Sequence, residues 1–103
     1  MAVSMNLTIH PFHMGTDKEA ALKPLEEAAE VYNAWQILQD GIDGDEGDEF
    51  SREYIRGESE RLADELADVV QAACNLAARY GLDMAAAMGR CEDRNRERGR
   101  YEH

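Results

Sequence analysis

The sequence has few cysteines and no long apolar run. Its 103 residues include only two cysteines, Cys74 and Cys91, which are too few for a disulfide scaffold or for a cysteine-ligated zinc site. We expect both to be small, at least partly buried thiols in a reducing compartment. No apolar stretch approaches the roughly 20 residues needed to cross a bilayer, and the first residues lack the basic and apolar regions of a secretion signal. These absences predict a soluble protein of the cytoplasm.

Positive charge is also scarce. The chain has 11 Lys and Arg residues against 22 Asp and Glu residues, which gives a formal net charge of −11. This balance argues against general affinity for nucleic acid or for an anionic membrane, because both would be repelled. It suits a protein that binds cations or presents an acidic surface to a basic partner.

The length predicts one domain over residues 16–103, after an irregular segment 1–15. The core of such a short domain is marginal, so we expect an oligomer.

The apolar residues repeat at helical spacing, and strand patterns are almost absent, which predicts an all-α fold. Thr16 and Glu19 have the spacing of a capping box, and they predict a helix that runs to about Asp40. Pro24 lies inside this pattern. It either kinks one long helix or marks the first turn of a second one.

Residues 40–50 are rich in glycine and acidic residues and predict a flexible loop. No register of this stretch places acidic ligands and glycine as an EF-hand requires, so we reject a calcium loop of that kind. A second helix is expected to resume at Ser51 or, after Gly57, at Glu58. It should end at Gly81, a residue type common just beyond helix C-termini.

Asp83 is placed to cap a third helix. This helix ends in a basic run, in contrast to the acidic remainder of the chain. The arginines of the run are Arg90, Arg94, Arg96, Arg98 and Arg100. They interrupt an otherwise negative surface.

Two of the predicted helices carry carboxylates three residues apart. Glu27 and Glu30 lie on the first helix, and Glu65 and Asp68 lie on the second. Each pair projects from one side of its helix, beside the apolar stripe. Four carboxylates near a packed interface repel one another, and a hard divalent cation such as Mg²⁺ removes that repulsion. Antiparallel helices could bring the two pairs face to face, as in the metal sites of helical bundles.

Carboxylates at this spacing are also common on solvated helix faces, so a single pair would indicate little. Two pairs on consecutive helices strengthen the case for a metal site. The spacing alone leaves both interpretations open.

The segments around these pairs resemble a known family. The first helix contains LEEAAEVYNAWQ, and the second contains ELADVVQAACNLAARYGLD. Together they resemble the MazG-like, all-α nucleoside triphosphate pyrophosphohydrolases, whose motif is E-E-x-x-E on one helix and E-x-x-D on the next. The likeness extends over residues 20–100 and includes RCEDRNRERGR, where such proteins carry an Asn and basic residues.

This resemblance implies Mg²⁺-dependent hydrolysis of a nucleoside or deoxynucleoside triphosphate to the monophosphate and pyrophosphate, as part of clearing the nucleotide pool. Mn²⁺ could take the place of Mg²⁺. Matching the motif position by position gives four metal ligands: Glu27, Glu30, Glu65 and Asp68. Glu26 matches a further Glu of the motif, with a catalytic role in orienting the attacking water or supporting the ligands.

The resemblance also implies contacts to the nucleotide. Asn95 matches the late Asn of the family. The candidates for phosphate contacts in the same segment are Arg90, Arg94 and Arg98. Relatives often carry a Lys in this segment, whereas this chain has Arg90 and no Lys there. Trp35 is a candidate for stacking on the base, with Tyr32 and Tyr54 as alternatives.

Two other functions stay open. Phosphoribosyl-ATP pyrophosphohydrolases share the helical fold and a similar Glu/Asp pattern. A non-enzymatic acidic protein, which binds a basic partner or mimics DNA, would account for the net charge and for the acidic loop 40–49. The arginine run argues against a DNA mimic. In each case we expect a homodimer or homotetramer, and no nucleic-acid or membrane partner.

Overall fold

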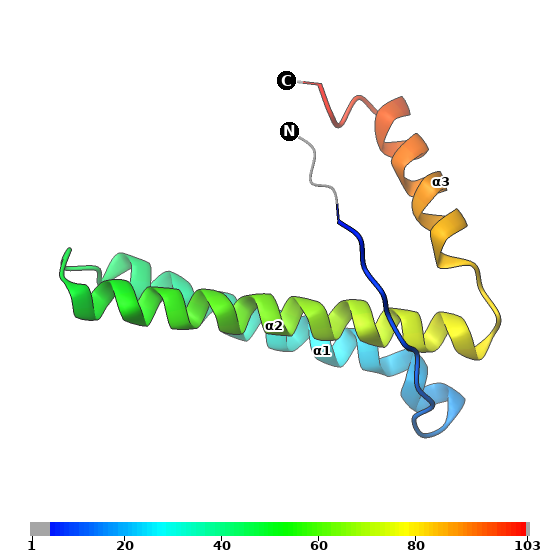
Figure 1. Cartoon of the computed structure of the whole chain (residues 1–103), viewed down its shortest axis with the longest axis horizontal. Helices are drawn as coiled ribbons and strands as arrows, with labels where there is room; N and C mark the ends of the chain where they lie inside the picture. The colour runs from blue at the N-terminus through cyan, green and yellow to red at the C-terminus, as the bar shows by residue number, and fades with distance from the viewer. Residues whose placement is uncertain (1–4, 103) are drawn as a thin grey trace.

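The computed structural model describes residues 5–102 and contains three helices. α1 spans Asp17–Asp43, α2 spans Glu49–Arg79 and α3 spans Met84–Glu97 (Figure 1). No strand occurs among the described residues, so the predicted all-α class is confirmed. None of these three helices is both long enough and apolar enough to cross a membrane.

α1 begins where the sequence predicts. Thr16 is its N-cap, and the Thr16 side-chain oxygen accepts a hydrogen bond of 3.1 Å from the backbone N–H of Glu19. This bond satisfies one of the donors that the first turn of a helix leaves free. Pro24 lies inside α1 and does not start a second helix. One long helix is therefore formed, which resolves the alternative posed by Pro24.

The connection between α1 and α2 is shorter than predicted, and the expectation of a loop over residues 40–50 is wrong at both ends. The two helices leave only residues 44–48 between them. Asp48 caps α2 by accepting a hydrogen bond of 2.8 Å from the backbone N–H of Ser51, so the helix starts earlier than expected. Gly57 lies within α2 and does not interrupt it.

Gly41 stays helical at a point where α2 comes close. A Cβ atom at this position would lie 2.8 Å from the ring of Tyr54 on α2, which is closer than packed atoms allow. The ring therefore packs on the bare backbone of α1, and this contact offsets the low helix propensity of glycine. Here glycine marks a close helix contact and not the end of a helix.

The end of α2 and the start of α3 match the prediction. Gly81 follows α2 with a φ of 64°, a left-handed conformation that favours glycine. Asp83 caps α3, and its Oδ1 accepts a hydrogen bond of 3.0 Å from the backbone N–H of Ala86. After this turn, α3 leaves the hairpin of α1 and α2 and stands apart from it (Figure 1).

α1 and α2 run antiparallel and side by side, and their most buried apolar side chains are small. Within residues 5–102, the buried apolar residues are four alanines: Ala20, Ala34, Ala72 and Ala77. Asn75 is the only buried polar residue in the same range. Alanines let two helices approach closely, but each buries little apolar area. The hairpin therefore has close backbones and a small core.

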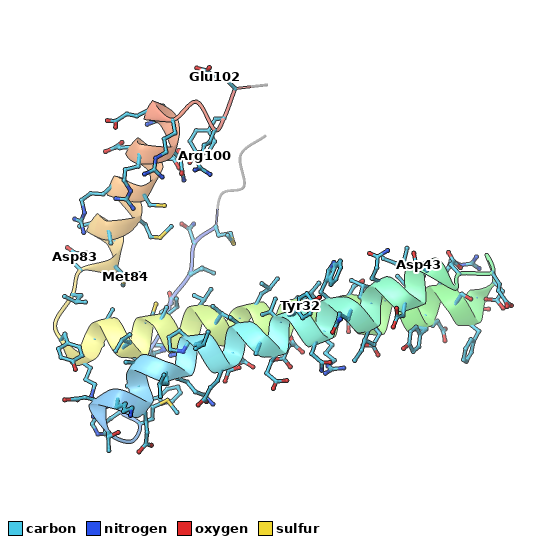
Figure 2. All side chains as sticks on the ribbon, turned by 180° about the vertical axis from the view of Figure 1, so that it is seen from behind. Tyr32, Asp43, Asp83, Met84, Arg100 and Glu102 are labelled. Atoms are coloured by element: carbon cyan, nitrogen blue, oxygen red, sulfur yellow. The ribbon has the colours of Figure 1, made fainter. Side chains whose placement is uncertain are left out.

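Large apolar side chains remain exposed around the helices (Figure 2). The most exposed of those that lie within helices are Leu25, Tyr32, Phe50 and Met88. The Cα radius of gyration is 17.1 Å, whereas a compact domain of about 100 residues has a value of about 13 Å. The chain is therefore open in shape, with apolar faces that its own helices do not cover.

Candidate metal centre

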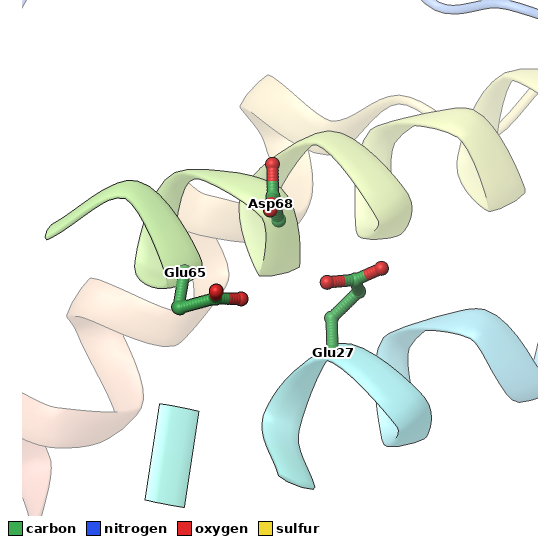
Figure 3. Close-up of side chains that lie close together, drawn as sticks. All are labelled: Glu27, Glu65 and Asp68. Carbon is green, nitrogen blue, oxygen red and sulfur yellow. The ribbon is translucent and has the colours of Figure 1, made fainter. Parts of the chain in front are cut away.

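Glu27 of α1 and two acidic residues of α2, Glu65 and Asp68, lie together on the hairpin (Figure 3). Each offers one carboxylate oxygen, and these three oxygens all lie within 4.8 Å of one another. Glu27 and Glu65 are half-buried, and Asp68 is exposed. The two halves of the sequence motif therefore meet in space. We call these three residues the carboxylate cluster.

Helical geometry and antiparallel packing together create the carboxylate cluster. Glu65 and Asp68 are three residues apart in α2, so they project from one side of that helix. Glu27 approaches them from α1, because the two helices pack side by side at this point. The cluster thus depends on the hairpin and not on any single helix.

The donor set suits a hard divalent cation, since Mg²⁺, Mn²⁺ and Ca²⁺ all prefer carboxylate oxygens. Opposite oxygens around an octahedral Mg²⁺ are about 4.2 Å apart, and those around Ca²⁺ about 4.8 Å apart. Small side-chain rotations would therefore bring the three oxygens onto one ion. Without a cation, carboxylates at this separation repel one another.

Lys23 provides positive charge beside the carboxylate cluster. Its Nζ lies 3.1 Å from Oε1 of Glu27 and 3.6 Å from Oε2 of Glu26. The hydrogen bond to Glu27, and then the charge of that carboxylate, raise the pKa of Lys23 above its ordinary value. A divalent cation at the cluster has to compete with this ammonium for Glu27. The sequence analysis missed Lys23, although its position four residues before Glu27 on one helix was an available signal.

Two other carboxylates of the motif lie outside the cluster. Glu30 is exposed on α1 and does not belong to the group of oxygens within 4.8 Å. Glu26 is also exposed and pairs with Lys23. The hairpin thus brings together three of the four predicted ligands. The roles of Glu30 and Glu26 stay predictions.

The predicted phosphate contacts lie on α3, away from the carboxylate cluster. They are Arg90, Arg94 and Asn95 within α3 and Arg98 as its C-cap. The Asn95 side-chain amide donates to the sulfur of Cys91 at 3.6 Å, a contact within α3 itself. Because α3 stands apart from the hairpin (Figure 1), residues 5–102 of one chain do not bring this set to the cluster.

Trp35, the candidate for base stacking, is also distant from the cluster. Its ring stacks on that of Tyr32, with 5.7 Å between the ring centroids. Eight residues separate Trp35 from Glu27, which corresponds to about 12 Å along a helix axis. Both rings are exposed, so the pair is available for a contact outside this chain.

A cavity of about 170 Å³ adjoins the carboxylate cluster. Glu27 and Asp68 line one part of it. Phe12 and Met14, from the segment before α1, line another part. No functional residue was predicted in this segment. The only signal in the sequence for a cavity wall here was the pair of apolar residues Phe12 and Met14 at alternate positions.

We predict that the carboxylate cluster binds Mg²⁺ or Mn²⁺. Asp68→Asn should weaken binding by about tenfold or more, because it replaces one of three charged ligands. The affinity is measured by titrating the protein with Mn²⁺ and detecting the free ion by electron paramagnetic resonance. Asp64→Asn is the matched control, because Asp64 is an exposed acid of α2 outside the cluster. An equal loss in both variants would contradict coordination and indicate attraction by net charge alone.

Comparison with known proteins identifies no relative of this chain. No family model, no curated protein and no solved structure matches it. The features of this chain that indicate a function are the carboxylate cluster, the cavity beside it and the sequence motif that supplies the carboxylates.

Proposed function

We propose that this chain is a MazG-like nucleoside triphosphate pyrophosphohydrolase that uses Mg²⁺ to cleave between the α- and β-phosphates. One observation carries the proposal. The two halves of the motif contribute Glu27, Glu65 and Asp68 to one cluster beside a cavity. A solvated acidic surface would not require carboxylates of different helices to converge in this way. The activity fits a cytoplasmic enzyme that clears nucleotides from the pool.

The chemistry fits what these residues offer. Phosphoryl transfer needs positioning and charge stabilisation more than covalent participation by the protein. A divalent cation, when bound, would neutralise phosphate charge and lower the pKa of a coordinated water. The carboxylate cluster would hold that cation and leave coordination positions for water and phosphate oxygens. Glu30 and Glu26, exposed on the same helix as Glu27, are available as a further ligand and a supporting carboxylate.

We further propose that a homodimer or homotetramer completes the site. The exposed apolar faces of the hairpin support this, because a second copy would remove them from water. In such an assembly, α3 of one chain can approach the carboxylate cluster of another. Its arginines and Asn95 would then contact the phosphates, for which the planar guanidinium group is well suited.

The first experiment incubates the protein with Mg²⁺ and a panel of canonical and modified nucleoside triphosphates, together with phosphoribosyl-ATP. We expect release of pyrophosphate without orthophosphate. Asp68→Asn should reduce the rate by about 10²-fold or more. Asp68 would hold the cation that stabilises the negative charge of the transition state, and the variant weakens that binding. Asp64→Asn should retain the rate. Orthophosphate as product, or no product from folded protein, would contradict the proposal. The latter result would favour an acidic binding protein.

A subunit-mixing experiment tests the shared site. Asp68→Asn impairs the carboxylate cluster, and Asn95→Ala impairs α3, so each variant alone should be inactive. If a dimer combines the two elements from different chains, randomly mixed subunits recover about a quarter of the wild-type sites. Pyrophosphate release after joint refolding measures the recovery, and light scattering gives the oligomeric state. A monomer, or a dimer without recovery, would contradict the shared site.

A further inference from the structure

Residues 10–15, which we call the strap, form neither helix nor strand and cross the hairpin before α1 begins (Figure 1). Polar side chains on one face of α2 hold the strap. They lie four residues apart in the sequence and are Gln71, Asn75 and Arg79. We call these three residues the polar ladder. Residues at this spacing return to nearly the same side of a helix, so the ladder forms a row along α2.

The first two members of the polar ladder bond to the strap and to each other. Gln71 Nε2 donates to the carbonyl oxygen of His10 at 3.1 Å, and the N–H of Phe12 donates to Asn75 Oδ1 at 3.0 Å. Gln71 Nε2 also donates to Asn75 Oδ1 at 2.9 Å. The backbone groups have fixed donor and acceptor roles, and they determine how both amides are oriented. Asn75 is only 7% exposed, so losing these partners would be costly.

Arg79 holds the other end of the strap. Its Nη1 donates to the carbonyl oxygen of Met14 at 3.1 Å, and its Nη2 donates to that of Gly15 at 2.8 Å. Its Nε forms an ion pair with the carboxylate of Asp17, in the first turn of α1. The planar guanidinium fixes these three directions at once. Arg79 therefore ties the strap to both helices.

The polar ladder bonds to alternate residues of the strap, through backbone atoms of His10, Phe12 and Met14. Every second residue of the strap thus meets the next side chain of the ladder.

The polar ladder contacts backbone atoms of the strap, which leaves the apolar side chains of the strap free for another role. Phe12 and Met14 line the cavity beside the carboxylate cluster, together with Glu27 and Asp68. An apolar wall at this place suits a base or a sugar better than a phosphate, which would be drawn to a cation at the cluster.

We propose that the polar ladder fixes the strap as one wall of this cavity, and that Phe12 and Met14 determine which nucleotide fits there. The proposal rests on the proposed function. Gln71, Asn75 and Arg79 are positioning residues, because they hold the strap, although Gln71 and Asn75 also line the cavity themselves. Phe12 and Met14 are specificity-determining residues, because their side chains would touch the ligand.

The first test measures whether the polar ladder holds the strap. Asn75→Leu keeps the branched shape and the number of heavy atoms of the side chain but removes the acceptor for the N–H of Phe12. Exchange of the amide hydrogen at position 12, followed by NMR, should be about tenfold faster or more in this variant. Asn75→Asp retains an acceptor oxygen and should restore slow exchange. Asn33→Leu, which changes an exposed Asn of α1, is the control.

The second test measures ligand selection with nucleotide analogues that carry a methylene bridge between the α- and β-phosphates. Asn75→Leu should weaken analogue binding in the presence of Mg²⁺ by about tenfold, and it should leave Mn²⁺ binding without nucleotide unchanged. Phe12→Ala removes only the side chain and leaves the ladder bonds in place. This variant should keep slow exchange at position 12 and change the relative affinities for different bases.

The results separate this proposal from the proposed function. Unchanged exchange at position 12 in Asn75→Leu would overturn the role of the ladder. Faster exchange with unaltered analogue affinity would overturn the strap as a wall of the ligand site. If wild-type protein binds Mn²⁺ and holds the strap but binds no nucleotide, the proposed function fails, and the role of Phe12 in selection fails with it.

Discussion

The close pairing of α1 with α2 is the constraint on which the candidate site depends. Both helices present alanines at the interface, and these small side chains let the backbones approach. That approach brings Glu27 of one helix to Glu65 and Asp68 of the other, with oxygens within 4.8 Å. The same pairing sets the repulsion between these groups, which a divalent cation would relieve. Packing and metal binding are thus coupled. Close helix packing brings the carboxylates together and makes them repel one another, and a bound cation would stabilise the hairpin by removing that repulsion.

The small interface has a second consequence. Alanines bury little area, the larger apolar side chains of the hairpin are half-buried or exposed, and α3 has no extensive contact with the hairpin among the described residues. In our proposal another copy of the chain covers these faces and places α3 near a carboxylate cluster. The strap is different, because its contacts lie within one chain and use polar side chains of α2. The cavity wall would therefore be formed before any assembly.

Features set by neighbouring residues were predictable from the sequence, and features set by distant contacts were not. Thr16 and Asp83 cap helices as predicted, because capping depends on residues within one turn. The length of the connecting loop was wrong, because Tyr54 packs on Gly41 from another helix and the glycine stays helical. The Glu/Asp spacing identified the motif, but spacing on one helix could not show that Glu30 lies outside the cluster. The strap was not predicted, because its bonds reach α2 more than sixty residues away.

The location of a bound cation on the chain decides whether the hairpin carries a metal centre. An NMR titration with small amounts of Mn²⁺ would measure paramagnetic broadening of backbone amide signals along the whole chain. We expect the signals near Glu27, Glu65 and Asp68 to broaden first, together with those of the strap. Broadening centred on the acidic turn at residues 44–48, or spread evenly over the acidic surface, would contradict a metal centre on the hairpin.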